Sequence, residues 1–437
     1  PPGLRAPSRA PRLARAMARW AALSAVAASA LAVCAVCVRR SAHGEQYVIS
    51  AIGGCSDGPY PPTPWDSILK VNGQLGSGAH ATVFAATLKG GVFPNVTADV
   101  PLAIKRIELR RKPETIQARM RAVKDSCVAN ALSRKEREPG WFPGVVPLDV
   151  RFAGALAFTV MEVGRDLRKV LNADLKKASE ARELVGWEDF ATFSQLARSA
   201  ALFHHIARAL RRLHLDGVVH CDVKLDNILV TREGAGRAWR VRIVDFDFAR
   251  PTDGSGDSRD ATAEYMSPEF WSDRRCDTGA DVWAAGVVLY ALVFGKFPYE
   301  IAAGTNRKSA AGITRTFSEG LQKNGVKLKL NTALLSAATQ LNQGDFVNDL
   351  PELLDAMFRD LFHMHIDKRR ERFLQTMTAA NTIAKKAARL AGENPATWMT
   401  EPPADRPAIK KGFTDFTPDA SFLSVLDKKT LEACLKL

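Results

Sequence analysis

The chain has 437 residues, of which 46% are hydrophobic and 25% are charged, and its formal net charge is +14. This balance argues against an intrinsically disordered chain and leaves room for a two-lobed domain with extensions. Half of the net charge lies in the first 44 residues, which hold seven arginines and no Asp or Glu. The rest is moderately basic, and no nucleic-acid motif accompanies it. A solvated basic surface is therefore favoured over a nucleic-acid partner.

The N-terminal segment predicts a secretory leader. Met17 opens a short basic stretch, an uncharged run follows from Trp20 to Val38, and small residues lie near Gly44. These are the regions of a signal peptide that starts at Met17. A retained anchor stays open as an alternative, because nineteen uncharged residues followed by Arg39 and Arg40 can just span a bilayer. The alanine-rich run favours cleavage, and a membrane contact would need either the retained leader or a basic surface.

The first predicted strands follow a Pro- and Gly-rich linker at 45–66. Residues 68–88 predict a strand, a turn and a strand, with Gly76 and Gly78 at the turn and Val83 just after it. Glycines there let backbone amides approach phosphate oxygens, because no Cβ stands in the way. An ordinary β-hairpin has the same pattern, so this motif alone is weak evidence.

The next predicted strand, 100–107, is largely apolar and contains Lys105. A lysine that points inward from a strand is costly unless anions pair with it. The helix predicted at 114–132 offers Asp125 as that partner, whereas Glu114 lies too early. An exposed helix carboxylate is the competing interpretation of Asp125.

Hydrophobic spacing predicts the remaining regular elements. Strands are expected at 146–152 and 156–163, and helices at 195–215, 279–294, 350–364 and 373–391.

The segment from His220 to Asn227 concentrates the chemistry. Asp222, Lys224 and Asn227 lie on one short turn between apolar runs, and Asp245-Phe246-Asp247 follows. A base for a hydroxyl, a cation for phosphate and an amide oxygen for a metal are what a phosphoryl-transfer site requires.

These segments resemble the catalytic and metal-binding loops of eukaryotic protein kinases, and further motifs occur in kinase order at kinase-like spacing. They are Gly76-Ser77-Gly78, Leu102-Ala103-Ile104-Lys105, Ser267-Pro268-Glu269 and Asp281-Val282-Trp283-Ala284-Ala285-Gly286. The resemblance implies an α+β, bilobal protein-kinase fold, with a small β-rich N-lobe that has one main helix and a larger helical C-lobe. It also implies transfer of the γ-phosphoryl group of ATP to Ser/Thr of protein substrates, with Mg²⁺ or Mn²⁺ as the metal.

On this interpretation the chain divides into five parts. They are a leader at 1–44, a linker at 45–66, the N-lobe at 67–163, the C-lobe at 164–395 with an insertion at about 301–345, and a C-terminal extension at 396–437.

The resemblance also assigns roles at the reacting centre. Asp222 would accept or orient the substrate hydroxyl proton, and Lys224 would neutralise charge on the γ-phosphoryl group. Asn227 and Asp245 would hold magnesium. Thr262 would bridge Asp222 and Lys224, as is usual in Ser/Thr kinases.

The nucleotide would contact the glycine-rich turn, the paired lysine, the hinge between the lobes and the first residues after it. The implied residues are Gly76, Gly78, Val83, Ala103, Lys105, Asp125, Met161, Glu162, Val163 and Asp166. A helix N-cap explains Asp166 equally well. Nearby, the resemblance implies that Asp281 caps the catalytic loop backbone and that Glu269 pairs with a C-lobe arginine, for which Arg370 is the expected partner.

Several positions depart from the kinase pattern. Cys221 stands where an arginine usually precedes the catalytic aspartate, so a phosphate on the activation segment would lack its cationic partner there. Activity would then need no activating phosphorylation. Asp247 replaces the usual glycine and Ala81 the third glycine of the turn.

A leader directly upstream of such a divergent kinase domain resembles the secreted rhoptry kinases of apicomplexan parasites. That resemblance implies delivery through a rhoptry-like organelle into a host cell or its parasite-containing vacuole. A pseudokinase scaffold that binds a partner protein is the alternative. The cysteines outside the leader predict free buried thiols, or one or two disulfides in an oxidising compartment.

Overall fold

The computed structural model describes residues 62–77, 81–94, 96–135, 144–180, 193–233, 238–253, 262–326, 344–395, 407–416 and 421–437. Within these ranges, the structure describes only the backbone at 174–180, 231–233, 238–239, 344–347, 407–408 and 414–416. The chain divides into two compact units, residues 1–69 and residues 70–437. The described end of the first unit is a turn, in which Thr63 donates its backbone N–H to Asp66 over 2.9 Å. The second unit contains all the motifs that carry the resemblance to protein kinases.

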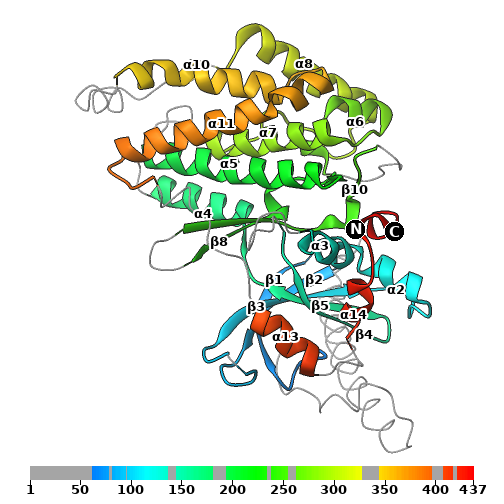
Figure 1. Ribbon diagram of the computed structural model, residues 1–437. Helices are drawn as coiled ribbons and strands as arrows, with labels where there is room; N and C mark the ends of the chain where they lie inside the picture. Colours follow the sequence, from blue (N-terminus) through cyan, green and yellow to red (C-terminus); the bar gives the residue numbers. More distant parts are fainter. Residues whose placement is uncertain are drawn as a thin grey trace, which may run out of the picture. The chain divides into compact units, whose positions relative to one another are not determined.

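The first lobe of this unit is built on a five-stranded sheet (Figure 1). Its strands are β1 (Leu69–Ser77), β2 (Ala81–Leu88), β3 (Val100–Glu108), β4 (Pro147–Ala153) and β5 (Leu156–Glu162), in the spatial order β1-β2-β3-β5-β4. Alternate residues of β2 (Phe84, Ala86 and Leu88) are buried, as expected for a strand with one face on the core. The strands predicted from sequence are confirmed.

The helix predicted at 114–132 is two helices, α2 (Ile116–Ala122) and α3 (Lys124–Ser133). They are separated at Val123, whose backbone angles (φ −127°, ψ 36°) are not helical. The break frees α3 to take its own direction, and all but three of its residues are buried.

The second lobe is helical. Its helices are α4 (Leu167–Glu180), α5 (Phe193–Leu215), α6 (Pro268–Asp273), α7 (Thr278–Phe294), α8 (Arg307–Asn324), α10 (Gly344–Leu361) and α11 (Ile366–Leu390). In Figure 1, α5, α7 and α11 lie side by side, and α8 and α10 lie beyond them from the sheet. Helix α7 is apolar all round and begins at the N-cap Asp277, whose side chain accepts from Gly279 and Ala280.

Short elements join the two lobes at the predicted catalytic segment. They are β6 (Arg165–Asp166), β7 (Val218–Val219), β8 (Ile228–Glu233), β9 (Ala238–Ile243) and β10 (Arg250–Pro251), with 3₁₀ turns at 225–227, 246–248 and 263–265. Strands β8 and β9 form a hairpin that pairs Ile228 with Ile243. The two polar segments that precede and follow this hairpin are thereby brought together. The α+β fold predicted from the sequence is confirmed.

The C-terminal segment returns to the first lobe. It contains α13 (Pro407–Phe416), α14 (Leu423–Asp427) and α15 (Leu431–Leu435), and these helices contact β4 and α3. The red C-terminal helix lies beside α3 in Figure 1. No pattern in the sequence indicated this arrangement.

Two disulfides join distant parts of the described chain. One links Cys127 of α3 to Cys434 of α15, and the other links Cys221 to Cys276. The thiols predicted as free or paired are therefore paired at these four positions.

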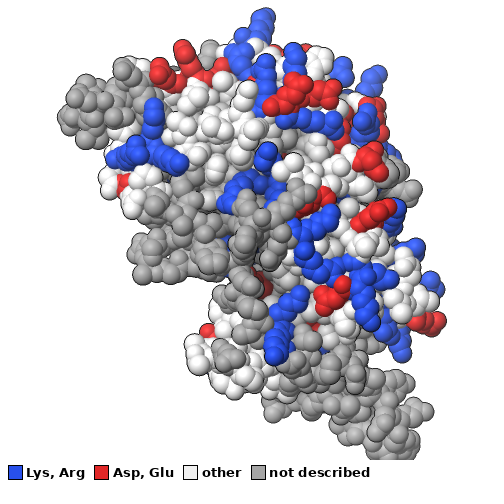
Figure 2. Space-filling view, viewed as in Figure 1, with Lys and Arg blue, Asp and Glu red and all other residues white. Residues whose placement is uncertain are grey.

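The described surface is mixed in charge. Figure 2 shows Lys and Arg side chains interspersed with Asp and Glu on the visible face. Among the helices that the structure describes, none has both the length and the apolar character needed to cross a membrane. The predicted leader at 1–44 lies outside the described residues.

Candidate active site

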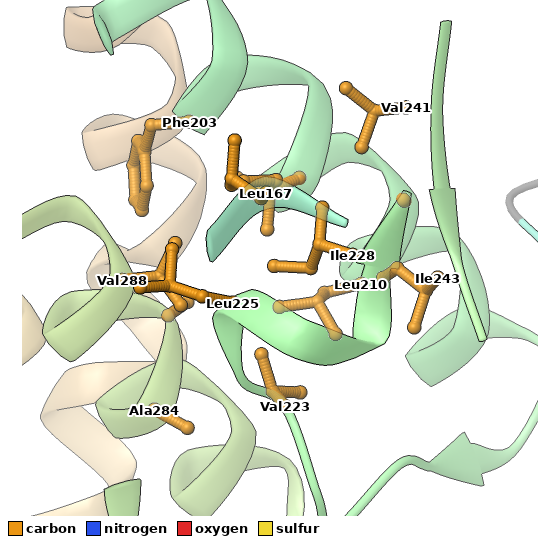
Figure 3. Packing of buried hydrophobic residues seen from close by; sticks show 14 of the residues in the cluster. Leu167, Phe203, Leu210, Val223, Leu225, Ile228, Val241, Ile243, Ala284 and Val288 are labelled. Atoms are coloured by element: carbon orange, nitrogen blue, oxygen red, sulfur yellow. The ribbon is translucent and has the colours of Figure 1, made fainter. Parts of the chain in front are cut away.

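The catalytic segment, 220–227, is held in place by apolar packing and hydrogen bonds to the second lobe. Its apolar residues join one buried cluster with neighbouring elements (Figure 3), which includes Val223, Leu225, Ile228, Leu210, Ile243, Ala284 and Val288. Asp281 of α7 accepts the backbone N–H groups of His220 (2.8 Å) and Cys221 (2.9 Å). Its Oδ2 also lies 2.9 Å from Nε2 of His214. The expected cap of the loop by Asp281 is present.

Cys221 has a positive φ of 66°. A non-glycine residue in this left-handed region costs of order 1 kcal/mol or more, and such residues persist where the surroundings fix them. Here the Asp281 carboxylate fixes the backbone on one side, and the disulfide to Cys276 fixes the side chain on the other. The position that departs from the kinase pattern is thus covalently tied to the segment just before α7.

Three of the four predicted catalytic residues bind the carboxylate of the fourth, Asp222. Lys224 Nζ lies 2.5 Å from Asp222 Oδ2 and 3.0 Å from Thr262 Oγ1. The Thr262 hydroxyl donates to Asp222 Oδ1 over 3.1 Å. Asn227 donates its amide N–H to Asp222 Oδ2 over 2.9 Å. Asp222 is only 5% exposed, so its geometry is set by these bonds.

A second cluster surrounds Lys105 of β3. Its ammonium lies 3.0 Å from Asp125, 3.5 Å from Asp245 and 3.6 Å from Asp247. The predicted pairing of Lys105 with Asp125 is therefore present. Asp125 is not the exposed helix carboxylate of the competing interpretation.

The charges of this cluster shift its acid–base equilibria. Burial would lower the pKa of Lys105, but the three surrounding carboxylates overcome it and hold the pKa above its usual value. Burial also opposes ionisation of Asp245, yet attraction to Lys105 outweighs it and lowers the pKa of that carboxyl. Desolvation and the two neighbouring carboxylates raise the pKa of Asp247, although its side chain is 44% exposed and solvent moderates the effect. Three carboxylates around one ammonium leave an excess of negative charge.

Helix α3 and the segment after β9 bind each other reciprocally. Asp125 Oδ1 accepts the backbone N–H of Phe246 (2.9 Å), and Asp247 Oδ1 accepts the backbone N–H of Asp125 (3.2 Å). Asp247 thereby binds a free N–H in the first turn of α3, whose N-cap Val123 has no side-chain hydrogen bond. The sequence showed the carboxylate but not this use of it.

The donor set fits a magnesium ion held jointly with phosphates. The Asn227 side chain donates its amide N–H groups to Asp222, so its amide oxygen is the atom that can bind a cation. Asp245 supplies a carboxylate at a residue with φ 71°, which aspartate tolerates better than most residues. Mg²⁺ is commonly bound by one or two protein oxygens plus substrate phosphates. Within the described residues no cluster of three or more His, Cys, Asp or Glu could hold a metal alone.

Several of the predicted nucleotide-contacting residues lie together on the sheet. Val83 and Ala103 lie on neighbouring strands, where Val83 is paired with Lys105 and Ala103 with Met161. Met161 also lines a small cavity with Asp125 and Phe246. The structure therefore brings these residues to one side of the sheet.

The other predicted positions are less decisive. Gly76 lies on β1 with open space around it, and Gly78 lies outside the described residues. Glu162 ends β5 and Val163 follows it. Asp166 accepts the backbone N–H of Lys169 over 2.8 Å, which is the N-cap alternative.

Residues 262–269 correspond to the end of a kinase activation segment, and Tyr265 anchors them to the catalytic loop. Tyr265 Oη lies 3.4 Å from the backbone N–H of Leu225 and 3.2 Å from Arg168, which in turn pairs with Asp226 at 2.8 Å. No sequence signal identified Arg168 or Tyr265 for this role.

The arginine expected to pair with Glu269 was misassigned. Arg369, not Arg370, pairs with Glu269, and Arg370 lies 3.2 Å from Asp277. Consecutive residues of a helix differ by about 100° in direction, so only one of the two can face Glu269. Arg369 is fully buried and is the one that does.

Comparison with known proteins agrees with this geometry. Residues 165–370 match the family described as "Protein kinase domain". The fold and this match agree on a protein kinase domain for this part of the chain. The matched range includes Asp222, Lys224, Asn227, Asp245 and Thr262, whereas the first lobe precedes it.

Relatives of this part of the chain are kinases by name, and one of them is named a serine/threonine-protein kinase. The chain is 28% identical over 239 residues to "Probable serine/threonine-protein kinase PknB" of Corynebacterium glutamicum, which covers 53% of this chain and 32% of that protein. It is 34% identical over 107 residues to "Mitogen-activated protein kinase kinase kinase 20" of Arabidopsis thaliana, covering 23% and 30%. It is 32% identical over 164 residues to "Ribosomal protein S6 kinase alpha-3" of Homo sapiens, covering 37% and 20%. The matched part thus spans about a third or less of each relative.

Proposed function

We propose that this chain is an ATP- and Mg²⁺-dependent protein kinase that phosphorylates Ser and Thr hydroxyls of protein substrates. The observation that carries the proposal is the cluster around Asp222, in which Lys224, Thr262 and Asn227 all bind one buried carboxylate. Lys105 with its three carboxylates provides the second half of the site.

The residues would divide the work of phosphoryl transfer. Asp222 orients the substrate hydroxyl and takes its proton as the oxygen bonds to the γ-phosphorus and the bond to the β,γ-bridging oxygen breaks. Lys224 lies beside Asp222 and neutralises charge on the group in transfer. Lys105 binds the phosphates that stay behind. Bound ATP and Mg²⁺ supply the phosphoryl group and screen its charge.

A catalytically impaired scaffold that binds a partner is the second candidate. Asp247 favours it, because an added carboxylate 3.6 Å from Lys105 competes with phosphate for that cation. The Lys105–Asp125 pair supports the enzyme instead, because a scaffold does not need that ion pair.

We further propose that the protein is a rhoptry-type secreted effector that acts in a host cell or parasite-containing vacuole after its leader is removed. The two disulfides support passage through an oxidising compartment. N-terminal sequencing of the protein secreted by its own cell tests this: a start after about residue 44 supports it, and a start at residue 17 contradicts it.

The kinase proposal is tested by label transfer. The purified chain receives γ-labelled ATP, Mg²⁺ and a generic basic protein, in parallel with Asp222→Asn. We expect label on Ser and Thr for the original chain and a loss of at least about a thousandfold in the variant. Equal labelling by both would point to a contaminating kinase and to the scaffold.

A further inference from the structure

The C-terminal segment, called segment 407–437 below and described at 407–416 and 421–437, packs on the first lobe and on the helix that carries Asp125. Cys434 of α15 is bonded to Cys127 of α3, and both residues are fully buried. The bond joins residues 307 positions apart with a Cα–Cα distance of 5.6 Å. The last helix of the described chain is thus covalently fixed to the helix that completes the nucleotide site.

Asn130 shows that α3 depends on this segment for more than the disulfide. Its side chain is fully buried, so both ends of the amide need partners. The Nδ2 group donates to Asp427 over 2.9 Å, and Oδ1 accepts from Lys410 over 3.3 Å. Both partners belong to 407–437, so removal of the segment would leave a buried amide without them.

The dependence runs in the other direction as well. Arg134, which follows α3, donates to the backbone carbonyls of Leu426, Asp427 and Lys429. Carbonyls at the end of a helix lack partners within it, and a cation there also suits the helix dipole. Arg134 therefore closes the C-terminal end of α14 from the first lobe.

The same segment is also fastened to the sheet. The backbone N–H of Phe422 donates to the Val150 carbonyl of β4 over 2.6 Å, and the Phe422 ring meets Phe152 edge to face at 5.2 Å. On α13, Phe413 meets Phe93 at 5.1 Å, and a Cβ on Gly412 would lie only 2.3 Å from that ring. The segment bridges β4 and α3 and fixes the helix relative to the sheet.

Helix α3 is buried and Ser126 bonds to Thr159 of β5 over 3.0 Å, but neither end of the helix is closed by its own residues. Its N-cap Val123 makes no side-chain bond, and its C-cap Arg134 lacks the left-handed backbone that commonly ends a helix. Yet Asp125 must stay within 3.0 Å of Lys105 and must accept from Phe246 beside the metal-binding aspartate. In protein kinases this lysine–carboxylate pair has to be in place for activity, and activation-segment phosphorylation often controls it.

We propose that segment 407–437 is a built-in clamp that positions α3 for catalysis and replaces the support that activation-segment phosphorylation gives elsewhere. Cys434 and Asp427 are then positioning residues for the Lys105–Asp125 pair, although neither touches substrate. This inference rests on the proposed kinase activity for its catalytic readout only.

The test removes the clamp in two independent ways and leaves the catalytic residues intact. Cys127→Ala/Cys434→Ala removes the covalent bond. Asp427→Ala keeps the disulfide but removes the acceptor from buried Asn130, and Asp427→Asn restores an oxygen in the same place. Glu432→Ala is the matched control, because Glu432 is an exposed carboxylate on α15 that pairs with Lys436.

Each protein is treated with phosphatase first, so that no phosphate can substitute for the clamp. Phosphoryl-transfer rates are then measured at saturating and at limiting ATP. Hydrogen exchange of the α3 backbone amides is measured separately on the same proteins. We expect the double variant and Asp427→Ala to raise the KM for ATP roughly five- to fiftyfold and to lose exchange protection in α3. Asp427→Asn should recover much of both, and Glu432→Ala should match the original chain.

Unchanged kinetics and unchanged α3 protection in both clamp variants would overturn the proposal, even if their melting temperatures fell. That combination is expected if segment 407–437 only stabilises the fold and does not position α3. If the double variant does not fold, Asp427→Ala against Asp427→Asn decides alone. If no protein transfers phosphate, the proposed function fails, and the α3 exchange pattern still accepts or rejects the clamp.

Discussion

The catalytic loop and helix α3 both carry a carboxylate that the site needs, but they are held in place differently. The loop is fixed by its own lobe: Asp281 lies 60 and 61 positions from the groups it binds, and the disulfide to Cys276 spans 55. Helix α3 is held by Asp247, 122 positions away, and by Cys434, 307 positions away. The loop is supported within its own lobe and forms a motif that can be recognised in the sequence. Helix α3 depends on contacts with distant segments that no local sequence pattern shows.

Loss of Asp245, the proposed metal-binding carboxylate, should have the largest effect on activity, because the proposed magnesium site needs its charge. Asp245→Asn keeps a side chain that tolerates a φ of 71° but removes the charge. We expect turnover to fall at least about a thousandfold with little change in melting temperature. Asp226→Asn, at an exposed ion pair with Arg168, is the control and should retain activity within a few-fold.

The local support of the loop is tested through stability. Asp281 is almost fully buried and accepts two backbone N–H groups, so Asp281→Ala leaves them without their acceptor. We expect the free energy of unfolding to fall by about 2–4 kcal/mol in urea titrations. Asp277→Ala removes the α7 N-cap and the ion pair with Arg370, and should cost about 1–2 kcal/mol. A loss of less than about 1 kcal/mol for Asp281→Ala would mean that its two bonds to the loop contribute little to stability.

The remote support of α3 is tested at Asp247. Asp247→Ala removes the acceptor for the first-turn N–H of α3, and we expect the KM for ATP to rise about three- to tenfold. Asp247→Asn keeps an acceptor oxygen and should stay close to the original value. If Asp247→Ala instead binds ATP more tightly, the carboxylate competes with phosphate and does not position the helix.

The smallest expected effect is a pH dependence in α5, which leads into the catalytic loop. Burial, with help from His205 and Arg208, lowers the pKa of His204 to about 4, although a bond to the Met377 carbonyl opposes this. The folded state thus binds this proton less readily than the unfolded state. Stability should fall as pH drops from about 6.5 toward about 4. In thermal melts, His204→Asn should be less sensitive to pH in this window, and an equal slope would exclude His204 as the cause.

Much of the fold and of the second-lobe site could be predicted because their signals are local. The apolar run of α7 with Asp277 before it, and the polar loop between apolar strands, specify elements without distant partners. The break at Val123 had no glycine or proline to mark it. Arg369 and Arg370 are neighbours on a helix, so the sequence could not decide which one faces Glu269.

The support of α3 could not be predicted for a different reason. Segment 407–437 has short helices and an ordinary composition. Its role depends on contacts with distant residues such as Asn130 and Cys127. Several cysteines allow many pairings, and only the fold selects one. Asp247 likewise stood out as a departure from the kinase pattern, but its hydrogen bond depends on where α3 lies.

The most direct test of the site is a crystal structure with a non-hydrolysable ATP analogue and Mn²⁺, whose anomalous signal locates the metal. The account predicts a peak bonded to Asn227 Oδ1 and an Asp245 oxygen, with phosphates reaching Lys105 while its pair with Asp125 is kept. A nucleotide bound elsewhere, or a metal held away from both ligands, would contradict it.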